Sequence, residues 1–226
     1  MSGKVPVIIH DEGVIMDIEL GEDILKKNTD QAKENRKLLD QHHVKAIDVM
    51  GSIGSGKTSL IGTLCSRLKD KYKIAFIAGD LTTTIDADRV KMHTVETVQL
   101  NTGKECHLDA LLVRNALNKI NLNAINLLII ENVGNLICPA EFDLGAHLRI
   151  VMVSVTEGPY MVVKHPYIFM GANIAVINKI DLAEAMDVDP DKLVKDALTI
   201  NPKITAVKTS VRTGEGIDSL IRALKL

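Results

Sequence analysis

The stretch that decides the fold is Gly51-Ser52-Ile53-Gly54-Ser55-Gly56-Lys57-Thr58. It directly follows the apolar run Ala46-Ile47-Asp48-Val49-Met50, which is typical of a buried strand, and it opens a segment of helical period. A strand, a loop of the form Gly-x-x-x-x-Gly-Lys-Ser/Thr and a helix together make a phosphate-binding loop. Because glycine is about 7% of average protein sequence, a chance match is expected in roughly one chain of this length in a hundred. A mere glycine-rich turn is therefore the weaker interpretation.

Each residue type in this loop has a distinct task. Glycines allow the backbone to wrap closely, so that successive N–H groups point at bound phosphates together with the positive end of the following helix. The Lys57 ammonium would meet the β- and γ-phosphates, and the Thr58 hydroxyl would be a ligand of Mg²⁺. The expected nucleotide contacts here are Gly51, Ser52, Ile53, Gly54, Ser55, Gly56, Lys57, Thr58 and Ser59.

The charge balance argues against several classes of partner. Lys and Arg number 27 against 29 for Asp and Glu, which gives a net charge of −2. A broad basic field that would attract nucleic acid or anionic lipid is missing, so we expect no nucleic acid and no membrane among the partners. The sequence has no apolar run of about 18 residues and no secretory pattern near Met1, which favours a cytoplasmic protein. Three cysteines in such a reducing compartment argue against disulfides.

The rest of the chain alternates apolar runs with segments of helical period. Residues 1–43 are expected to form an N-terminal extension whose polar segment Leu20–Gln41 is a surface helix packed on the core, and residues 44–226 to form one domain. Seven strands are predicted, at Val44–Met50, Lys73–Ala78, Thr97–Leu100, Leu127–Ile130, Arg149–Val155, Ile174–Ile177 and Ile204–Val207. Further helices are predicted at Lys57–Lys69, His107–Ile120, Pro190–Thr199 and Ile217–Leu224. This alternation predicts an α/β fold with a doubly wound, mostly parallel sheet.

A base-recognition sequence follows the predicted strand Ile174–Ile177. Asn178-Lys179-Ile180-Asp181 is similar to the guanine-reading sequence of GTPases. The Asp181 carboxylate can accept from the ring N–H and the amino group of guanine, whereas adenine would leave it unpaired, so GTP is favoured over ATP. Lys179 can cover the purine face with its aliphatic stem, and Asn178 can tie this segment to the phosphate loop. A backbone N–H at or near Ser210 could reach the guanine carbonyl oxygen.

Acidic residues at two further strand ends are placed to serve the metal ion of a bound nucleotide. Asp80 and Glu131 each follow an apolar run, so both could hold Mg²⁺ directly or through water. Glu131-Asn132-Val133-Gly134 resembles the γ-phosphate switch of GTPases, with the Gly134 N–H as sensor and Glu in place of the usual Asp. Asp86 could orient or deprotonate the attacking water, with helix capping as the alternative. The expected catalytic set is Lys57, Asp86, Glu131 and Gly134.

Cys106, His107 and Cys138 form a second candidate site. Cys106-His107 opens a predicted helix and Cys138 lies shortly after Glu131, so all three side chains would sit near the γ-phosphate edge. Two thiols and an imidazole suit Zn²⁺ or Ni²⁺. Spacing alone leaves the ordinary interpretation open, in which the cysteines are small buried residues and the histidine is a surface residue. Cys65, inside the first helix after the phosphate loop, is expected to be a packing residue.

Two longer stretches resemble one family. Asn101-Thr102-Gly103-Lys104-Glu105-Cys106-His107-Leu108-Asp109 and Glu131-Asn132-Val133-Gly134-Asn135-Leu136-Ile137-Cys138-Pro139 are similar to the hydrogenase nickel-incorporation GTPases, the HypB family of the SIMIBI class. The likeness covers nearly the whole chain. It implies that Cys106, His107 and Cys138 bind zinc or nickel where two subunits meet. It further implies GTP hydrolysis to GDP, a homodimer in the GTP state, and work with other hydrogenase maturation proteins to deliver nickel to the large subunit of nickel–iron hydrogenase.

The chain departs from that family in one respect, and three alternatives are open. Many bacterial members carry an N-terminal cysteine motif or a histidine-rich stretch, whereas residues 1–43 hold no cysteine and only His10, His42 and His43, so a separate nickel store is not expected. A urease accessory GTPase would share the fold, but its metal motif resembles Cys-Pro-His, whereas Cys106-His107 and Cys138-Pro139 lie apart in this chain. A phosphotransferase would not need the guanine-reading sequence. A metal carrier that uses GTP only as a timer is the third alternative.

Overall fold

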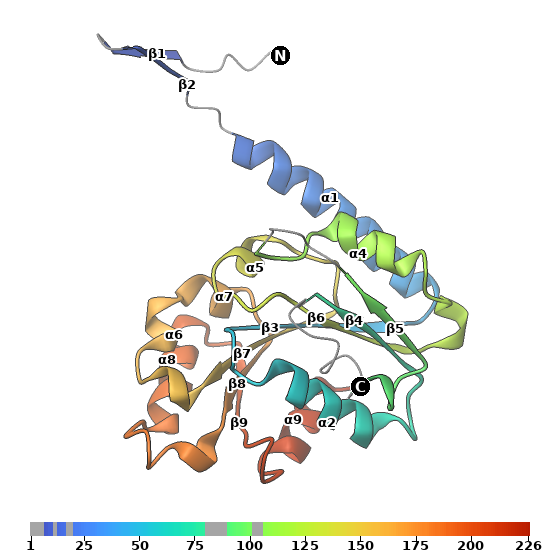
Figure 1. The fold of residues 1–226 in the computed structure, drawn as a ribbon, viewed down its shortest axis with the longest axis vertical. Coiled ribbons are helices and arrows are strands. Elements are labelled where there is room, and N and C mark those ends of the chain that lie inside the picture. The colour runs from blue at the N-terminus through green and yellow to red at the C-terminus, as the bar shows by residue number, and fades with distance from the viewer. Residues whose placement is uncertain (1–6, 11–12, 17–19, 80–89, 101–105) are drawn as a thin grey trace.

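A computed structural model of the chain describes residues 7–10, 13–16, 20–79, 90–100 and 106–226. In this part of the chain the main sheet has seven strands, all parallel, in the order β5-β4-β6-β3-β7-β8-β9 (Figure 1). The central strand β3 leads into the phosphate loop, with β6 on one side and β7 on the other. The strands are β3 (Lys45–Gly51), β4 (Ile74–Ala78), β5 (Glu96–Gln99), β6 (Leu127–Glu131), β7 (Leu148–Ser154), β8 (Ile174–Asn178) and β9 (Thr205–Lys208).

Helical segments connect most of these strands. The α-helices are α1 (Leu20–Gln41), α2 (Lys57–Leu68), α4 (Ala110–Leu117), α5 (Cys138–Glu141), α6 (Met161–Lys164), α7 (Pro166–Met170), α8 (Pro190–Ile200) and α9 (Ile217–Leu224), with 3-10 turns η1 (Leu122–Ala124), η2 (Val155–Glu157) and η3 (Ile180–Leu182). An antiparallel hairpin, β1 (Val7–His10) and β2 (Gly13–Met16), forms a separate small sheet ahead of α1. None of the helices in the described ranges combines the length and the apolar character needed to cross a membrane.

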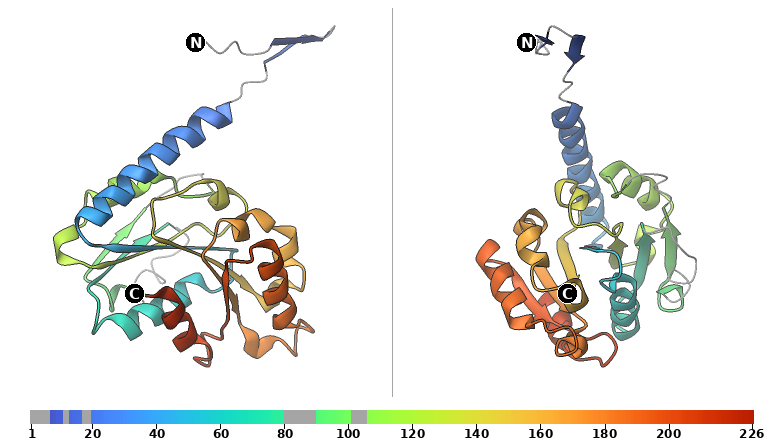
Figure 2. Two further views of the ribbon diagram at one scale, coloured as in Figure 1. Left: turned by 180° about the vertical axis from the view of Figure 1, so that it is seen from behind. Right: turned by 60° about the vertical axis from the view of Figure 1, so that its left-hand side comes forward.

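Helices cover both faces of the sheet, which explains why strands such as β4, β6 and β8 are mainly apolar (Figure 2). On one face α2 and α9 bury residues such as Leu64 and Leu220 against alternate side chains of the strands. On the other face, α1 and α4 pack over β4 and β6, and α5 to α8 pack over β7 and β8. Every residue of β4, β6 and β8 is buried as a result.

The sequence predictions for the elements hold with small shifts at the ends. All seven predicted strands are present, and the sheet is doubly wound and parallel as expected. One prediction was wrong in its boundary, because the helix expected from His107 begins only at Ala110. The Asp109 carboxylate accepts the Leu112 N–H at 2.7 Å and caps the helix there, which leaves Cys106 and His107 in the bend before it. The hairpin β1–β2 and the short helices α5, α6 and α7 were not predicted.

The helix α1 is bound to the domain by buried polar contacts as well as by apolar packing. Its Ala32 and Leu39 are buried. The Asn28 amide accepts the Ala110 N–H at 2.8 Å and donates to the Asp143 carbonyl at 2.9 Å. This side chain therefore joins the start of α4 to the segment after α5. The expected boundary between an extension (1–43) and a domain (44–226) stays a prediction, but α1 supports structure on both sides of the candidate metal ligands.

Candidate functional site

The candidate site lies where parallel strands end at one edge of the sheet. β3 ends in the phosphate loop, β6 ends at Glu131 and β8 ends at Asn178. Because parallel strands all point the same way, their carboxyl ends meet at this edge, and the loops beyond them can face one ligand. Two groups of side chains meet there, a nucleotide-type pocket and a cluster of sulfur and nitrogen ligands.

The phosphate loop has the backbone that its glycines predict. Gly56 has φ 100, and a Cβ at this position would lie 2.7 Å from the Asn178 Nδ2 atom, so a larger residue would be both strained and crowded. α2 begins directly after it, at Lys57. The Lys57 ammonium is buried and donates to the carbonyls of Gly51 at 3.2 Å and Ser52 at 3.0 Å, at the mouth of the loop. The predicted phosphate ligands thus form one continuous cradle.

Thr58 and Glu131, two of the three predicted magnesium ligands, are in contact, and their magnesium role stays a prediction. The Thr58 hydroxyl donates to the Glu131 Oε1 atom at 2.7 Å, and Glu131 is only 3% exposed. A hydroxyl and a carboxylate are hard oxygen ligands of the kind that Mg²⁺ prefers, so these two residues fit the ion of a nucleotide complex. The other expected magnesium ligand, Asp80, and the candidate catalytic residue Asp86 lie outside the described residues.

Gly134 lies against the phosphate loop. A Cβ added to it would be 2.5 Å from the Ile53 Cγ1 atom and 3.2 Å from the Ile53 nitrogen. The next residue continues the contact, because the Asn135 N–H donates to the Gly51 carbonyl at 3.0 Å. The segment after β6 therefore rests on the loop at two successive residues. A role for the Gly134 N–H as γ-phosphate sensor fits this position and stays a prediction.

The residues predicted to read the base line a cavity of about 290 Å³ beside the phosphate loop, which we call the base cavity. The Asn178 amide donates to the Ser55 carbonyl at 2.8 Å, and the Lys179 ammonium donates to the Gly54 carbonyl at 2.8 Å, so both tie the base loop to the phosphate loop. Lys179 has φ 60, which turns the chain sharply after β8. The lining of the cavity comprises Gly56, Ser59, Asn178, Lys179, Asp181, Leu182, Val211 and Arg212.

Ser210 is less suited to contact a base than its neighbours. It is buried, and its N–H donates to the Glu215 carbonyl at 3.0 Å, so this donor is already used within its own loop. Its hydroxyl accepts the Thr213 N–H at 3.2 Å. The next two residues, Val211 and Arg212, line the base cavity instead. The contact expected at or near Ser210 is therefore better assigned to the following backbone.

Sequence reasoning overlooked Glu157 beside the phosphate loop. Its carboxylate accepts the Ser154 N–H at 3.0 Å and closes a capping box at η2. Burial raises the pKa of Glu157, and the nearby Ser52 hydroxyl and the ammonium groups of Lys179 and Lys57 partly oppose that rise. The only local signal was the pair Ser154 and Glu157 three residues apart, which indicates a cap and says nothing of the loop.

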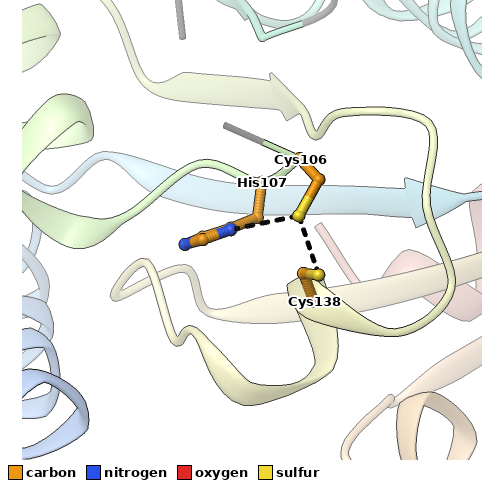
Figure 3. A group of neighbouring side chains, drawn as sticks. All are labelled: Cys106, His107 and Cys138. Atoms are coloured by element: carbon orange, nitrogen blue, oxygen red, sulfur yellow. Dashed lines mark hydrogen bonds between the residues drawn. The ribbon is translucent and has the colours of Figure 1, made fainter. Parts of the chain in front are cut away.

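Cys106, His107 and Cys138 come together as one cluster (Figure 3). The two sulfur atoms lie 2.8 Å apart, the Cys106 sulfur lies 3.8 Å from the His107 Nδ1 atom, and all three ligand atoms are within 4.8 Å of one another. Cys106 is exposed and the other two are half-buried, so the cluster opens to the surface. Two thiols and an imidazole fit Zn²⁺ or Ni²⁺, and three ligands leave coordination positions for a further donor.

An aromatic residue beside the cluster helps to hold its histidine in place. The His107 ring stacks on the Phe142 ring with centroids 3.8 Å apart, which orients the imidazole.

Cys65 behaves as predicted: it is fully buried in α2, and burial raises the pKa of its thiol to about 12, so it remains a neutral packing residue.

A buried polar network under the cluster was not predicted. Asp48 on β3 accepts the Asn132 amide at 3.2 Å and pairs with Arg149 at 3.7 Å. Asn132 accepts the Leu108 N–H at 3.2 Å, and Arg149 donates to the Pro139 carbonyl at 2.6 Å, so both segments that carry the thiols are held from below. Burial raises the pKa of Asp48 to about 6, while Arg149 and Asn132 act to lower it.

Comparison with known proteins shows the family to which the chain belongs. Residues 45–208 match the model of the CobW/HypB/UreG nucleotide-binding domain. The probable hydrogenase maturation factor HypB of Methanocaldococcus jannaschii is 54% identical over 208 residues, which cover 92% of this chain and 94% of that protein.

Two solved structures are similar over most of their length. The hydrogenase maturation factor HypB of Archaeoglobus fulgidus has a TM-score of 0.84 at 44% identity, with 88% of this chain and 98% of that chain covered. HypB of Helicobacter pylori in complex with nickel has a TM-score of 0.81 at 32% identity, with 88% and 95% covered. The chain therefore belongs to the CobW/HypB/UreG family and, within it, to the hydrogenase maturation factors HypB.

Proposed function

We propose that this chain is a GTP-binding, GTP-hydrolysing metallochaperone that helps to deliver nickel to the large subunit of nickel–iron hydrogenase. The observation that carries the proposal is the segment from Glu131 to Cys138, which serves two sites. At its start Glu131 accepts the Thr58 hydroxyl at 2.7 Å, and at its end Cys138 lies 2.8 Å from Cys106. A nucleotide and a metal ion would therefore contact one short stretch of backbone.

The nucleotide half of the proposal rests on the loop contacts. Lys57 would stabilise the negative charge of bound phosphates at the mouth of the loop, and Thr58 and Glu131 would supply oxygen ligands for Mg²⁺. Mg²⁺, when bound there, would neutralise the charge that develops on the leaving phosphate. Asp181 lines the base cavity, which supports GTP rather than ATP as the nucleotide. Asp86 keeps its proposed role in orienting the attacking water.

The metal half rests on the thiol pair and on the relatives. A sulfur-rich cluster that is open to the surface can accept an ion and release it, because its ligands are not enclosed by the fold. The nickel bound to the Helicobacter pylori relative favours nickel over zinc as the cargo. Three ligands from one chain also leave room for ligands from a second copy, which supports a homodimer in the GTP state. We place this work in the cytoplasm, together with other hydrogenase maturation proteins.

The test of this proposal is the molecular mass in solution under four conditions. Light scattering after gel filtration would compare the protein with GDP and with a non-hydrolysable GTP analogue, each with and without one equivalent of nickel. We expect monomers with GDP and dimers with the analogue, and nickel that elutes with the protein. A mass that is independent of nucleotide would contradict the GTP-dependent dimer, and nickel in the small-molecule fraction would contradict the metal role.

Hydrolysis separates the alternative functions. A GTPase releases phosphate from GTP in the absence of any acceptor molecule, whereas a phosphotransferase requires one. If hydrolysis is part of the mechanism, Asp86→Ala should slow it by about 100-fold or more, as expected for loss of a group that positions the nucleophile. A slow release of phosphate that Asp86→Ala leaves unchanged would instead favour a carrier in which GTP acts only as a timer.

A further inference from the structure

We propose that Asn135 is the positioning residue that transmits the state of the phosphate loop to the thiol pair. This inference rests on the proposed function, because it names the residue through which nucleotide would alter metal affinity. Asn135 lies in the segment between β6 and α5, in neither the nucleotide motif nor the ligand cluster. Its backbone contacts the phosphate loop, and its side chain contacts the two segments that carry Cys106 and Cys138.

The backbone contact is with the first residue of the phosphate loop. The Asn135 N–H donates to the Gly51 carbonyl at 3.0 Å, and the same carbonyl accepts the Lys57 ammonium at 3.2 Å. The residue that would bind the β- and γ-phosphates and the residue that leads to the thiols thus share one acceptor. A shift of Lys57 towards bound phosphate would change the hydrogen bonding of the Gly51 carbonyl. Asn135 would be affected directly, because its N–H bonds to the same carbonyl.

The side-chain contacts join the two segments that carry the thiols. The Asn135 Nδ2 atom donates to the Cys106 carbonyl at 3.3 Å, and its Oδ1 atom accepts the Ile137 N–H at 2.8 Å. Ile137 directly precedes Cys138. Because donor and acceptor belong to one planar amide, the side chain fixes the spacing of these two backbone groups. The sulfur atoms attached to the segments lie 2.8 Å apart.

The surrounding structure makes this amide the adjustable link. Asp48, Asn132 and Arg149 hold the residues next to the ligands, Leu108 and Pro139, through buried contacts. Packed interiors of this kind resist gradual movement. Asn135 itself is only half-buried and lies nearer the surface. A small rotation of its amide would therefore alter the relative position of Cys106 and Cys138 while the network below stays in place.

The experiment measures nickel affinity by competition with a metallochromic dye, in the GDP state and in the state with a non-hydrolysable GTP analogue. In the unmodified chain we expect the two affinities to differ. Asn135→Ala keeps the backbone N–H on Gly51 but removes both side-chain contacts. Changes in the outer shell of a metal site typically cost about 10- to 100-fold in affinity, so we expect a loss of about that size in the tighter state. The ratio of the two affinities should fall to about one.

Two further variants sharpen this test. Asn135→Asp keeps an acceptor for the Ile137 N–H and loses the donor to the Cys106 carbonyl, so it should also lose most of the ratio. Asn123→Ala is the matched control, because Asn123 is exposed and bonds to His42, away from either site. It should behave as the unmodified chain does. GTP affinity should stay within about twofold in all three variants, since both Asn135 variants keep the backbone contact with Gly51 and Asn123 bonds to His42 instead.

The outcomes separate the inference from the proposed function. If Asn135→Ala lowers nickel affinity equally in both nucleotide states and preserves their ratio, the residue is merely structural and the inference is overturned. The same holds if the unmodified chain binds nickel equally in both states, or if Asn135→Ala changes nothing. If the unmodified chain binds no nickel or no GTP, it is the proposed function that fails, and the dye and nucleotide titrations report that directly.

Discussion

The Thr58 hydroxyl donates a hydrogen bond of 2.7 Å to the Glu131 carboxylate, which joins the last residue of the phosphate loop to the end of β6. The register of the sheet produces this contact, because Val49 on β3 pairs with Glu131 on β6. The chain then continues from Glu131 into the segment that ends at Cys138. The pair therefore marks the point at which the nucleotide-type pocket and the sulfur cluster begin to share structure.

Removing the Thr58 hydroxyl should weaken magnesium-dependent hydrolysis. Hydrogen bonds and ligand contacts to charged groups contribute about 1.5–3 kcal/mol, so Thr58→Ala should slow phosphate release by about 10- to 100-fold at low Mg²⁺ concentration. Thr58→Ser keeps the hydroxyl and should stay near the rate of the unmodified chain. Phosphate release measured across a magnesium titration checks this. Equal rates for the Ala and Ser variants at every magnesium concentration would show that the hydroxyl is not a ligand.

Asp181 should determine which base the cavity accepts. Asp181→Asn replaces one of the two acceptor oxygens of the carboxylate by an NH2 donor group, so it should lose about 1.5–3 kcal/mol towards GTP, which is about 10- to 100-fold in affinity. The same amide can donate to the C2 carbonyl of xanthine. Xanthosine triphosphate should therefore bind to the Asp181→Asn variant better than it binds to the unmodified chain. Titration with fluorescent nucleotides measures both constants. An unchanged preference for GTP would place the base elsewhere.

Cys138 should be required for nickel, whereas Cys65 should not. Cys138→Ser replaces a soft thiolate by a hydroxyl, and we expect the loss to exceed the roughly 10- to 100-fold change of an outer-shell variant. Cys65→Ala is the control within the same chain, since Cys65 is buried in α2 and its pKa is raised to about 12. Equilibrium dialysis with nickel measures both. Tight binding by Cys138→Ser would remove this thiol from the ligand set.

Features that depend on neighbouring residues could be predicted from the sequence, whereas contacts between residues far apart in the chain could not. Lys57 and Thr58 belong to one contiguous loop, and Asp181 to one tetrapeptide, so a local pattern was enough to propose roles for them, which stay predictions. The apolar runs of the sheet were equally clear because both its faces are buried. Asp48 and Asn132 are 84 positions apart, and no local pattern connects them.

The short helices could not be predicted from the sequence either. α5 is four residues long, which is too short for a helical period to appear in a sequence, and α6 and α7 are similar. The sequence did place Cys106, His107 and Cys138 on one edge, but it could not predict that Asn135 would contact Gly51, Cys106 and Ile137 together. Those contacts depend on how the segment after β6 folds over the loop.

The stability of the fold should depend on the protonation of His147. Its Nδ1 atom accepts the Ala46 N–H at 2.9 Å at the start of β3, and its Nε2 atom donates to Asp40 of α1 at 2.8 Å. The ring must therefore be neutral to make both contacts. Burial lowers the pKa of His147, and the bond to Asp40 only partly opposes this. The bond to His147 also lowers the pKa of Asp40.

Both shifts have the same sign for stability. A histidine with a lowered pKa in the folded state contributes stability that is fully present above its unfolded value of about 6.5 and is lost as the pH falls below it. The carboxylate of Asp40 adds a loss at still lower pH. Losing one hydrogen bond costs about 1 kcal/mol, which corresponds to about 2–4 °C in the unfolding temperature of a chain of this size.

Thermal unfolding at pH 7.5 and pH 5.5 tests the His147 prediction. We expect the unmodified chain to lose at least those few degrees between the two values, and His147→Asn, whose amide oxygen can still accept the Ala46 N–H, to lose less. His43→Asn is the matched control, because His43 is exposed and its φ of 55 is one that asparagine tolerates. It should keep the full pH dependence. If His147→Asn keeps it as well, groups other than His147 control the acid sensitivity of the fold.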